Sequence, residues 1–399
     1  MVTPARRYWR PAELRHDEEE GRHRPVGWLE LFYDLVFVVI IATLATDLTH
    51  HLAGQGLLRF GLQFMAVFWV WNAYTYYTER FETDGLENRL FTFLGILTVA
   101  GLAVWAPDGL DSNYTAFVGS YLAARGLNIA LWLRAGRRER QFLPIAMRFT
   151  AGFLFATTIL TGSLAAEGNL RLVLFGIAVI VEIAAPIFTI RQQDELPPLS
   201  RSKWPERFGL FTMIVLGETV ADVVHALSTS DAEGHGGPAM IGRGVLALAV
   251  GFALWWVYFD FIARRPTLPR VAPALAWVYL HLVMLMTITV AGVSLAETLT
   301  AAGRDEFPTS LRELLLVNGG AAVAAIGVLE TTLDRDEGEP THPILSPALK
   351  IGLGGVLATV GLLDLPWTPT AALLACLVTL AVPAAYGARV WYRRGPDAR

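Results

Sequence analysis

The chain has 399 residues, of which 54% are hydrophobic and only 17% are charged, whereas charged residues make up about 25% of ordinary soluble domains. A net charge of -4 argues against a nucleic-acid partner, and the single cysteine, Cys376, excludes an internal disulfide framework. The composition therefore predicts an integral membrane protein.

The N-terminal stretch, residues 1–28, is strongly polar. It carries six arginines among acidic residues and has no apolar core, so it does not have the pattern of a secretory signal. We expect residues 1–28 to form a cytoplasmic N-terminal arm.

Apolar runs of about 20 residues, the length that a helix needs to cross the hydrocarbon core, fill the rest of the chain. Twelve runs are separated by charged or Pro/Gly-rich breaks. They cover residues 29–52, 57–79, 88–106, 114–134, 143–165, 169–190, 207–228, 241–263, 272–299, 310–332, 346–364 and 369–392. The pattern predicts an all-α polytopic membrane protein of about 12 transmembrane helices, with a cytoplasmic linker at 191–206 and a cytoplasmic tail at 393–399.

The positive charges predict the orientation. With the N-terminus inside, 24 of the 32 arginines and lysines fall in inner segments and 5 in outer segments, which leaves Arg125, Arg148 and Lys350 within the spans. Because positive residues concentrate on the cytoplasmic side, both termini are predicted to be cytoplasmic.

The two halves of the chain resemble each other in sequence. Matches occur in order in all six helix pairs, including Trp71 and Tyr74 with Trp255 and Tyr258, Thr98–Gly101 with Thr289–Gly292, and Arg148 with Lys350. These matches predict a six-helix repeat at 29–190 and a second at 207–392. Because six is an even number, we expect parallel repeats that are related by a two-fold axis along the membrane normal.

Ionisable side chains in the spans are candidate functional residues, because each is costly in the bilayer without a partner or water. Glu218, Asp222 and His225 are spaced i, i+4 and i+7, which places them on one face of a helix, and Asp47 and His50 repeat the pattern in the first span. Carboxylates beside an imidazole are suited to proton exchange. The alternative is that both histidines lie at the outer interface and only Glu218 is deep.

Arg125 and Glu182 lie near the middle of their spans, so each requires an opposite charge, a backbone carbonyl or a water-filled cavity. A purely structural ion pair with Asp34 or Glu218 is the alternative to a functional role. Arg148 and Lys350 are closer to the inner ends of their spans, where we expect them to reach the cytoplasmic headgroups.

Two further residues are candidates on weaker patterns. Asp260 follows an aromatic group, where it is expected either to line a cytoplasmic vestibule or to be solvated. His281 is deep in its span, and packing is favoured over metal ligation because no second His or Cys lies at ligand spacing. The chain has no phosphate loop, nucleotide fingerprint or nucleophile elbow. We therefore predict no cofactor, no metal and no catalytic residue.

Three sequence motifs resemble the bacterial low-temperature-requirement protein A family. They are Glu30–Phe37, Glu206–Phe211 leading to Leu216–Glu218, and Trp255–Asp260. The resemblance covers nearly the whole chain and implies a bacterial plasma-membrane protein, but it carries no established reaction or substrate. The stretch Phe32–Phe37 is also similar to the Phe-Ser-Asp motif that opens each repeat in lysosomal-type potassium and proton channels, with Tyr33 in place of the serine.

The leading functional hypothesis is a secondary transporter or an ion- or proton-conducting protein in the bacterial cytoplasmic membrane. Glu218 and Asp222, with Asp34 and Arg125 opposite, would line a polar cavity between the repeats, and the partners would be the lipid bilayer, a small solute or ion, and in an assembly a second copy. One alternative is a lipid-modifying intramembrane enzyme with Glu218, Asp222 and His281 as acid–base groups. Another is a non-catalytic membrane sensor or assembly factor.

Overall fold

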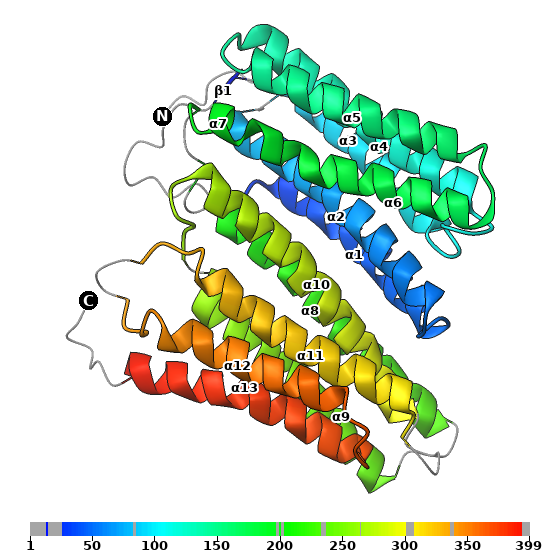
Figure 1. Cartoon of the computed structure of the whole chain (residues 1–399), viewed down its shortest axis with the longest axis vertical. Helices are drawn as coiled ribbons and strands as arrows, with labels where there is room; N and C mark the ends of the chain where they lie inside the picture. The colour runs from blue at the N-terminus through cyan, green and yellow to red at the C-terminus, as the bar shows by residue number, and fades with distance from the viewer. Residues whose placement is uncertain are drawn as a thin grey trace. The chain divides into compact units, whose positions relative to one another are not determined.

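The computed structural model describes residues 13–14, 26–82, 85–196, 199–200, 203–232, 237–263, 265–300, 307–335 and 339–392. Most of the predicted N-terminal arm, the tail at 393–399 and part of the linker lie outside these residues. Within them the predicted all-α architecture of a polytopic membrane protein is confirmed (Figure 1).

The first half of the chain forms six long helices. They are α1 (Trp28–Thr49), α2 (Gln55–Arg80), α3 (Leu86–Trp105), α4 (Tyr114–Arg138), α5 (Leu143–Ser163) and α6 (Gly168–Ala184). A 3-10 turn, η1 (Ala185–Thr189), and the short α7 (Ile190–Gln193) follow. The predicted span at 169–190 is thus interrupted near Pro186, because proline lacks the N–H that an α-helix requires. Two-residue strands, β1 (Glu13–Leu14) and β2 (Phe81–Glu82), pair antiparallel.

The second half forms six more long helices. They are α8 (Lys203–Ala232), α9 (Pro238–Tyr258) with a π-helical turn η2 (Phe259–Ala263), α10 (Val271–Thr300), α11 (Thr309–Glu330), α12 (Leu345–Gly361) and α13 (Pro369–Tyr392). The predicted spans match these helices in order, with ends that differ by a few residues.

Ten helices in the described part of the chain are long and apolar enough to cross a membrane. The helix α12 is apolar but has only 17 residues. The helix α2 has 26 residues but is more polar, and its buried residues include Gln63, Asn72 and Tyr74. The Gln63 side chain donates a hydrogen bond to the Ala106 carbonyl.

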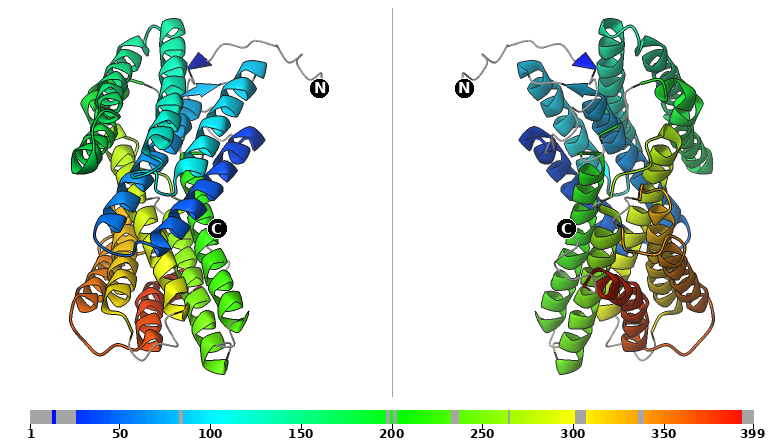
Figure 2. Two further views of the ribbon diagram at one scale, coloured as in Figure 1. Left: turned by 90° about the vertical axis from the view of Figure 1, so that its right-hand side faces the viewer. Right: turned by 90° about the vertical axis from the view of Figure 1, so that its left-hand side faces the viewer.

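The chain divides into two compact units. Unit 1 comprises residues 1–47, 57–207 and 269–275, and unit 2 comprises 48–56, 208–268 and 276–399. In unit 1, α4 packs against α3 and α5, and α5 packs against α6. In unit 2, α11, α12 and α13 lie side by side, with α9 against α13 (Figures 1 and 2). The first five residues of α8 belong to unit 1 and the rest of this helix to unit 2.

An aromatic core stabilises unit 1. The ring of Trp132 on α4 stacks on Phe142 at a centroid distance of 5.2 Å and contacts Tyr77 and Phe149 edge-on. Such ring pairs add to the free energy gained by burying the side chains. They hold α4 in the position from which its polar residues reach α6.

Candidate functional site

Asp34 and Arg207 form a buried ion pair within unit 1. The Arg207 Nη2 atom lies 2.6 Å from Asp34 Oδ1, and the indole N–H of Trp71 donates to the same oxygen at 2.8 Å. Arg207 also donates to the hydroxyl groups of Thr75 and Thr78 on α2. The guanidinium therefore connects the start of α8 with α1 and α2.

A second ion pair extends this cluster. The Lys203 Nζ atom lies 2.7 Å from Glu30 Oε1, and the guanidinium of Arg207 lies 3.9 Å from the same oxygen. Two acids on α1 thus meet two bases at the beginning of α8, all within unit 1. Opposite charges in equal number reduce the cost of burying each of them. Arg207 lies within the motif Glu206–Phe211, but nothing in the sequence pattern identifies it as the partner of Asp34.

Arg125 and Glu182 pair with each other, and not with Asp34 or Glu218 as the structural alternative expected. Arg125 Nε on α4 lies 2.7 Å from Glu182 Oε2 on α6, and both side chains are buried. The Tyr121 hydroxyl donates to Glu182 at 2.5 Å and accepts from Arg125 Nη2 at 2.8 Å. The prediction that Arg125 has an acidic or carbonyl partner is confirmed.

Glu218 and Asp222 lie one turn apart on α8, within unit 2, and both side chains are partly exposed. The negative charges of Glu218 and of Glu297 on α10 both act on Asp222. Among the described residues, none of these three carboxylates has a basic side chain within ion-pair distance. A Cβ on Gly292 would lie 2.4 Å from the Thr219 hydroxyl, so α10 approaches α8 closely beside these acids.

The two histidines of the predicted helix faces are exposed, as is expected for residues near an interface. His50 follows α1 and His225 lies in the second half of α8. Asp47, one turn before His50, is partly exposed and accepts a hydrogen bond from the backbone N–H of Asp108 at 3.5 Å. The imidazoles are thus more accessible than the carboxylates that precede them.

Asp260 and His281 have local partners in unit 2. The carboxylate of Asp260, in the π-helical turn, accepts from the indole N–H of Trp256 at 2.7 Å. His281 on α10 is fully buried, with Nδ1 2.8 Å from the Trp277 carbonyl and Nε2 3.0 Å from the Tyr258 hydroxyl. Both ring nitrogens are therefore engaged, which supports the packing interpretation. Among the residues that the structure describes, no group of three His, Cys, Asp or Glu side chains is arranged to hold a metal ion.

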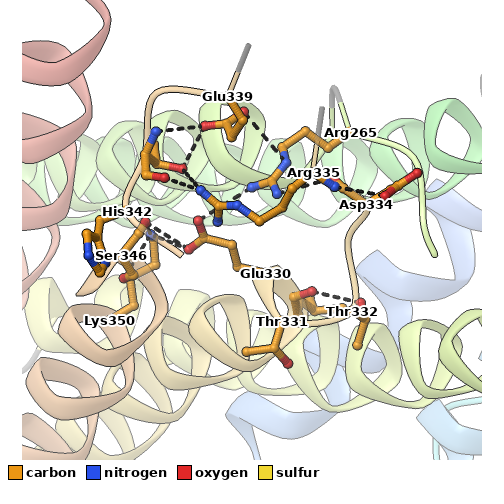
Figure 3. A network of polar contacts seen from close by, with 12 residues as sticks. Arg265, Glu330, Thr331, Thr332, Asp334, Arg335, Glu339, His342, Ser346 and Lys350 are labelled. Atoms are coloured by element: carbon orange, nitrogen blue, oxygen red, sulfur yellow. Dashed lines mark hydrogen bonds and ion pairs between the residues drawn. The ribbon is translucent and has the colours of Figure 1, made fainter. Parts of the chain in front are cut away.

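A polar network in unit 2 corrects the expectation for Lys350 (Figure 3). Lys350 does not reach toward headgroups: it is fully buried, and its Nζ atom lies 2.9 Å from Glu330 Oε2 on α11. Ser346 donates to the same oxygen at 3.0 Å, and Arg265 lies 3.5 Å from Glu330 Oε1. The ammonium group also lies over the ring of Phe261. The sequence could not predict this outcome because the acid lies on another helix.

The loop after α11 continues this network. Arg265 Nε lies 3.8 Å from Glu339, whose carboxylate accepts from the Thr341 hydroxyl at 2.6 Å, and Arg335 donates to the Thr341 carbonyl (Figure 3). These contacts join the start of α12 to the loops around it. The network therefore stabilises this part of unit 2.

The fold and these buried charges define an all-helical, multi-pass membrane protein, and its described spans contain both ion-paired acids and acids without a basic partner among the described residues. The chain belongs to the bacterial low temperature requirement A protein (LtrA) family, whose model matches residues 25–387. A relative, the uncharacterized protein RA0937 of Rhizobium meliloti (strain 1021), is 28% identical over 242 residues, which are 58% of this chain. The match spans 57% of that protein's length, and no solved structure matches the chain.

Proposed function

We propose that the protein is a secondary transporter or an ion-conducting protein in the bacterial cytoplasmic membrane, and that Glu218 and Asp222 carry a cation or proton. The observation that supports this most is the contrast between these two partly exposed acids and three acids that are buried in the spans. Asp34, Glu182 and Glu330 each have a basic group within 3 Å. Glu218 and Asp222 have none among the described residues.

The depth of Glu218 makes this contrast informative. It lies fifteen residues after Lys203, the first residue of α8, or about 22 Å along the axis at about 1.5 Å per residue. A hydrocarbon core is about 30 Å thick, so this position is far from both ends of a spanning helix. A carboxylate there requires water, a bound cation or a proton.

The second carboxylate, Asp222, lies one turn away from Glu218, so the repulsion between the two charges must also be relieved. Like charges at i and i+4 repel, and the negative charge of a third acid, Glu297, also acts on Asp222. A cation that binds between them, or a proton that they exchange, relieves the repulsion. Packing by itself gives no reason for this arrangement. A translocated cation or proton supplies one.

The test is a flux measurement on the reconstituted full chain. Proteoliposomes with an internal pH-sensitive dye receive a pH jump, and the rate of internal pH change is recorded for the wild type, Glu218→Gln and Asp222→Asn. We expect both variants to fold and to lose pH-dependent flux, because the amides keep the shape but do not titrate. The matched control is Glu195→Gln, an exposed acid outside the spans. Unchanged flux in a folded Glu218→Gln protein contradicts the proposal.

The lipid-modifying enzyme has less support. His281, its proposed acid–base group, is buried, and both of its ring nitrogens are engaged by Trp277 and Tyr258. A sensor or assembly factor accounts for the paired charges but assigns no role to Glu218 and Asp222. A folded Glu218→Gln protein that keeps its cellular function would favour that class.

A further inference from the structure

One end of the unit 1 helices carries a group of exposed arginines, which we call the arginine patch. It consists of Arg89, Arg137, Arg138, Arg140 and Arg148. Among the described residues, none of the five has an ion-pair partner. Their neighbour Arg134 differs, because it pairs with Glu87. Glu139 is the acid within this stretch, and it forms no ion pair with the patch.

The patch is assembled by helix packing. Arg89 lies in the first turn of α3, Arg137 and Arg138 end α4, Arg140 is in the following loop and Arg148 is in the second turn of α5. Because α4 packs against both α3 and α5, these helix ends are neighbours (Figure 1).

Two arginines near the other end of the unit 1 helices, Arg59 at the start of α2 and Arg171 at the start of α6, are engaged by protein groups. Arg59 pairs with Asp111 at 2.9 Å. Arg171 donates to the Ala166 carbonyl at 3.0 Å and lies over the Tyr114 ring. The exposed arginines of the patch, which have no ion-pair partner among the described residues, therefore differ from the two arginines near the other end of these helices.

The position of Arg148 in α5 indicates that the patch lies at the membrane surface. It lies about 7.5 Å into the apolar helix α5, at about 1.5 Å per residue. The part of α5 that other helices leave uncovered carries exposed apolar residues, namely Met147, Leu154 and Phe155, which are 53%, 52% and 61% exposed, and Phe155 lies two turns after Arg148 on the same face. In a spanning helix this face meets acyl chains, so the Arg148 guanidinium must extend toward the membrane surface. The anion available there is a lipid phosphate.

We propose that the arginine patch binds the headgroup of an anionic phospholipid. A guanidinium presents paired N–H donors that match two phosphate oxygens, and arginine holds them better than a lysine ammonium group does. The apolar face beside Arg148 accommodates the acyl chains of the same molecule. This combination favours a lipid over a free phosphate or a soluble anionic partner. The inference is independent of the proposed transport function.

The test titrates the purified full chain, in neutral detergent, with phosphatidylglycerol, phosphatidylcholine or inorganic phosphate and records the Tm. We expect only phosphatidylglycerol to raise the Tm of the wild type. In R137Q/R138Q/R148Q the concentration needed should increase about fivefold for each arginine removed. The matched control, R191Q/R270Q/R389Q, removes three exposed arginines outside the patch and should respond as the wild type does.

If the glutamine variant does not fold, the three titrations of the wild type still test the proposal. An equal increase of Tm with phosphatidylcholine or with inorganic phosphate overturns it. So does a folded R137Q/R138Q/R148Q protein with an unchanged titration. The variant R137K/R138K/R148K, which keeps the charge but loses the paired donors, should fall between the wild type and the glutamine variant.

Discussion

Arg125 and Glu182 illustrate what a buried charge requires of its neighbours. Removing a guanidinium from water is expensive, and a single carboxylate at 2.7 Å recovers only part of that cost. The Tyr121 hydroxyl, the Trp69 carbonyl and the Phe153 ring complete the environment. The pair is therefore weak evidence for stability, but the loss of one partner leaves the other unpaired and buried.

Arg125→Gln should destabilise the protein by about 3–5 kcal/mol, because it leaves the Glu182 carboxylate buried without a cation. The measurement is unfolding of the purified chain in detergent by heat or denaturant. The double variant Arg125→Gln/Glu182→Gln removes both charges and should recover much of the loss. A double variant that is less stable than either single variant would rule out a simple pair.

Arg207→Lys tests the connection between α1, α2 and α8. The substitution keeps the charge but loses the fork that reaches Asp34, Thr75 and Thr78 together, so we expect a loss of about 1–3 kcal/mol. The matched control is Arg191→Lys, because Arg191 is exposed and should tolerate the change. Equal stability of the two variants would mean that the fork is dispensable.

The residue scale also limits what the sequence could predict. Apolar runs identify Arg125 as a residue that needs a partner, because the cost depends only on its depth. They do not identify the partner, because the two members of a buried pair can lie far apart in the sequence. Asp34 and Arg207, for example, are separated by 173 positions. The expectation for Lys350 is wrong for the same reason: its position near a helix end predicts contact with headgroups, but Glu330 on the adjacent helix binds it.

At the scale of elements, α11 and α12 pack through small residues. A Cβ on Gly354 would lie 2.4 Å from the Gly320 carbonyl oxygen and 2.6 Å from the Ala324 nitrogen. Close backbone approach through small residues at i and i+4 is a common basis of helix association in membranes. A side chain at either glycine would collide with the backbone of the other helix. The backbone could avoid this collision only if the two helices moved apart.

Gly354→Ala should accordingly destabilise the protein by about 1–3 kcal/mol, the usual cost of overpacking. Gly355→Ala, one position along, meets nothing within 4 Å and should be neutral or slightly stabilising, since alanine favours the helix. Parallel unfolding curves of the two variants measure the difference. A smaller loss for Gly354→Ala than for Gly355→Ala would contradict the packing model.

At the scale of the whole molecule, the order and lengths of the spans are well predicted from apolar runs, because each span must cover the same hydrocarbon thickness. The internal repeat stays a prediction. One pair of matched residues is informative: Tyr74 on α2 bonds to Thr92 on α3, and Tyr258 on α9 bonds to His281 on α10. The matched tyrosines thus use partners on corresponding helices, although the partner residues differ.

The charge distribution predicts that both termini are cytoplasmic. A reporter that is active only in the cytoplasm, fused after Arg399, should be active, and one that is active only in the periplasm should be silent. The physical reason is the concentration of arginine in alternate loops. Fusions after Ala166, between α5 and α6, should give the opposite result and serve as the control.

The Asp34–Arg207 pair sets an order of events during synthesis. Asp34 leaves the ribosome 173 residues before Arg207, which at about 5–20 residues per second is a wait of roughly 9–35 s. Throughout this interval α1 carries a carboxylate whose cation does not yet exist. We therefore expect the first spans of the chain to depend on the insertion machinery or on bound water until α8 has been synthesised. Nascent chains arrested before residue 203 should be degraded faster than chains arrested after α8.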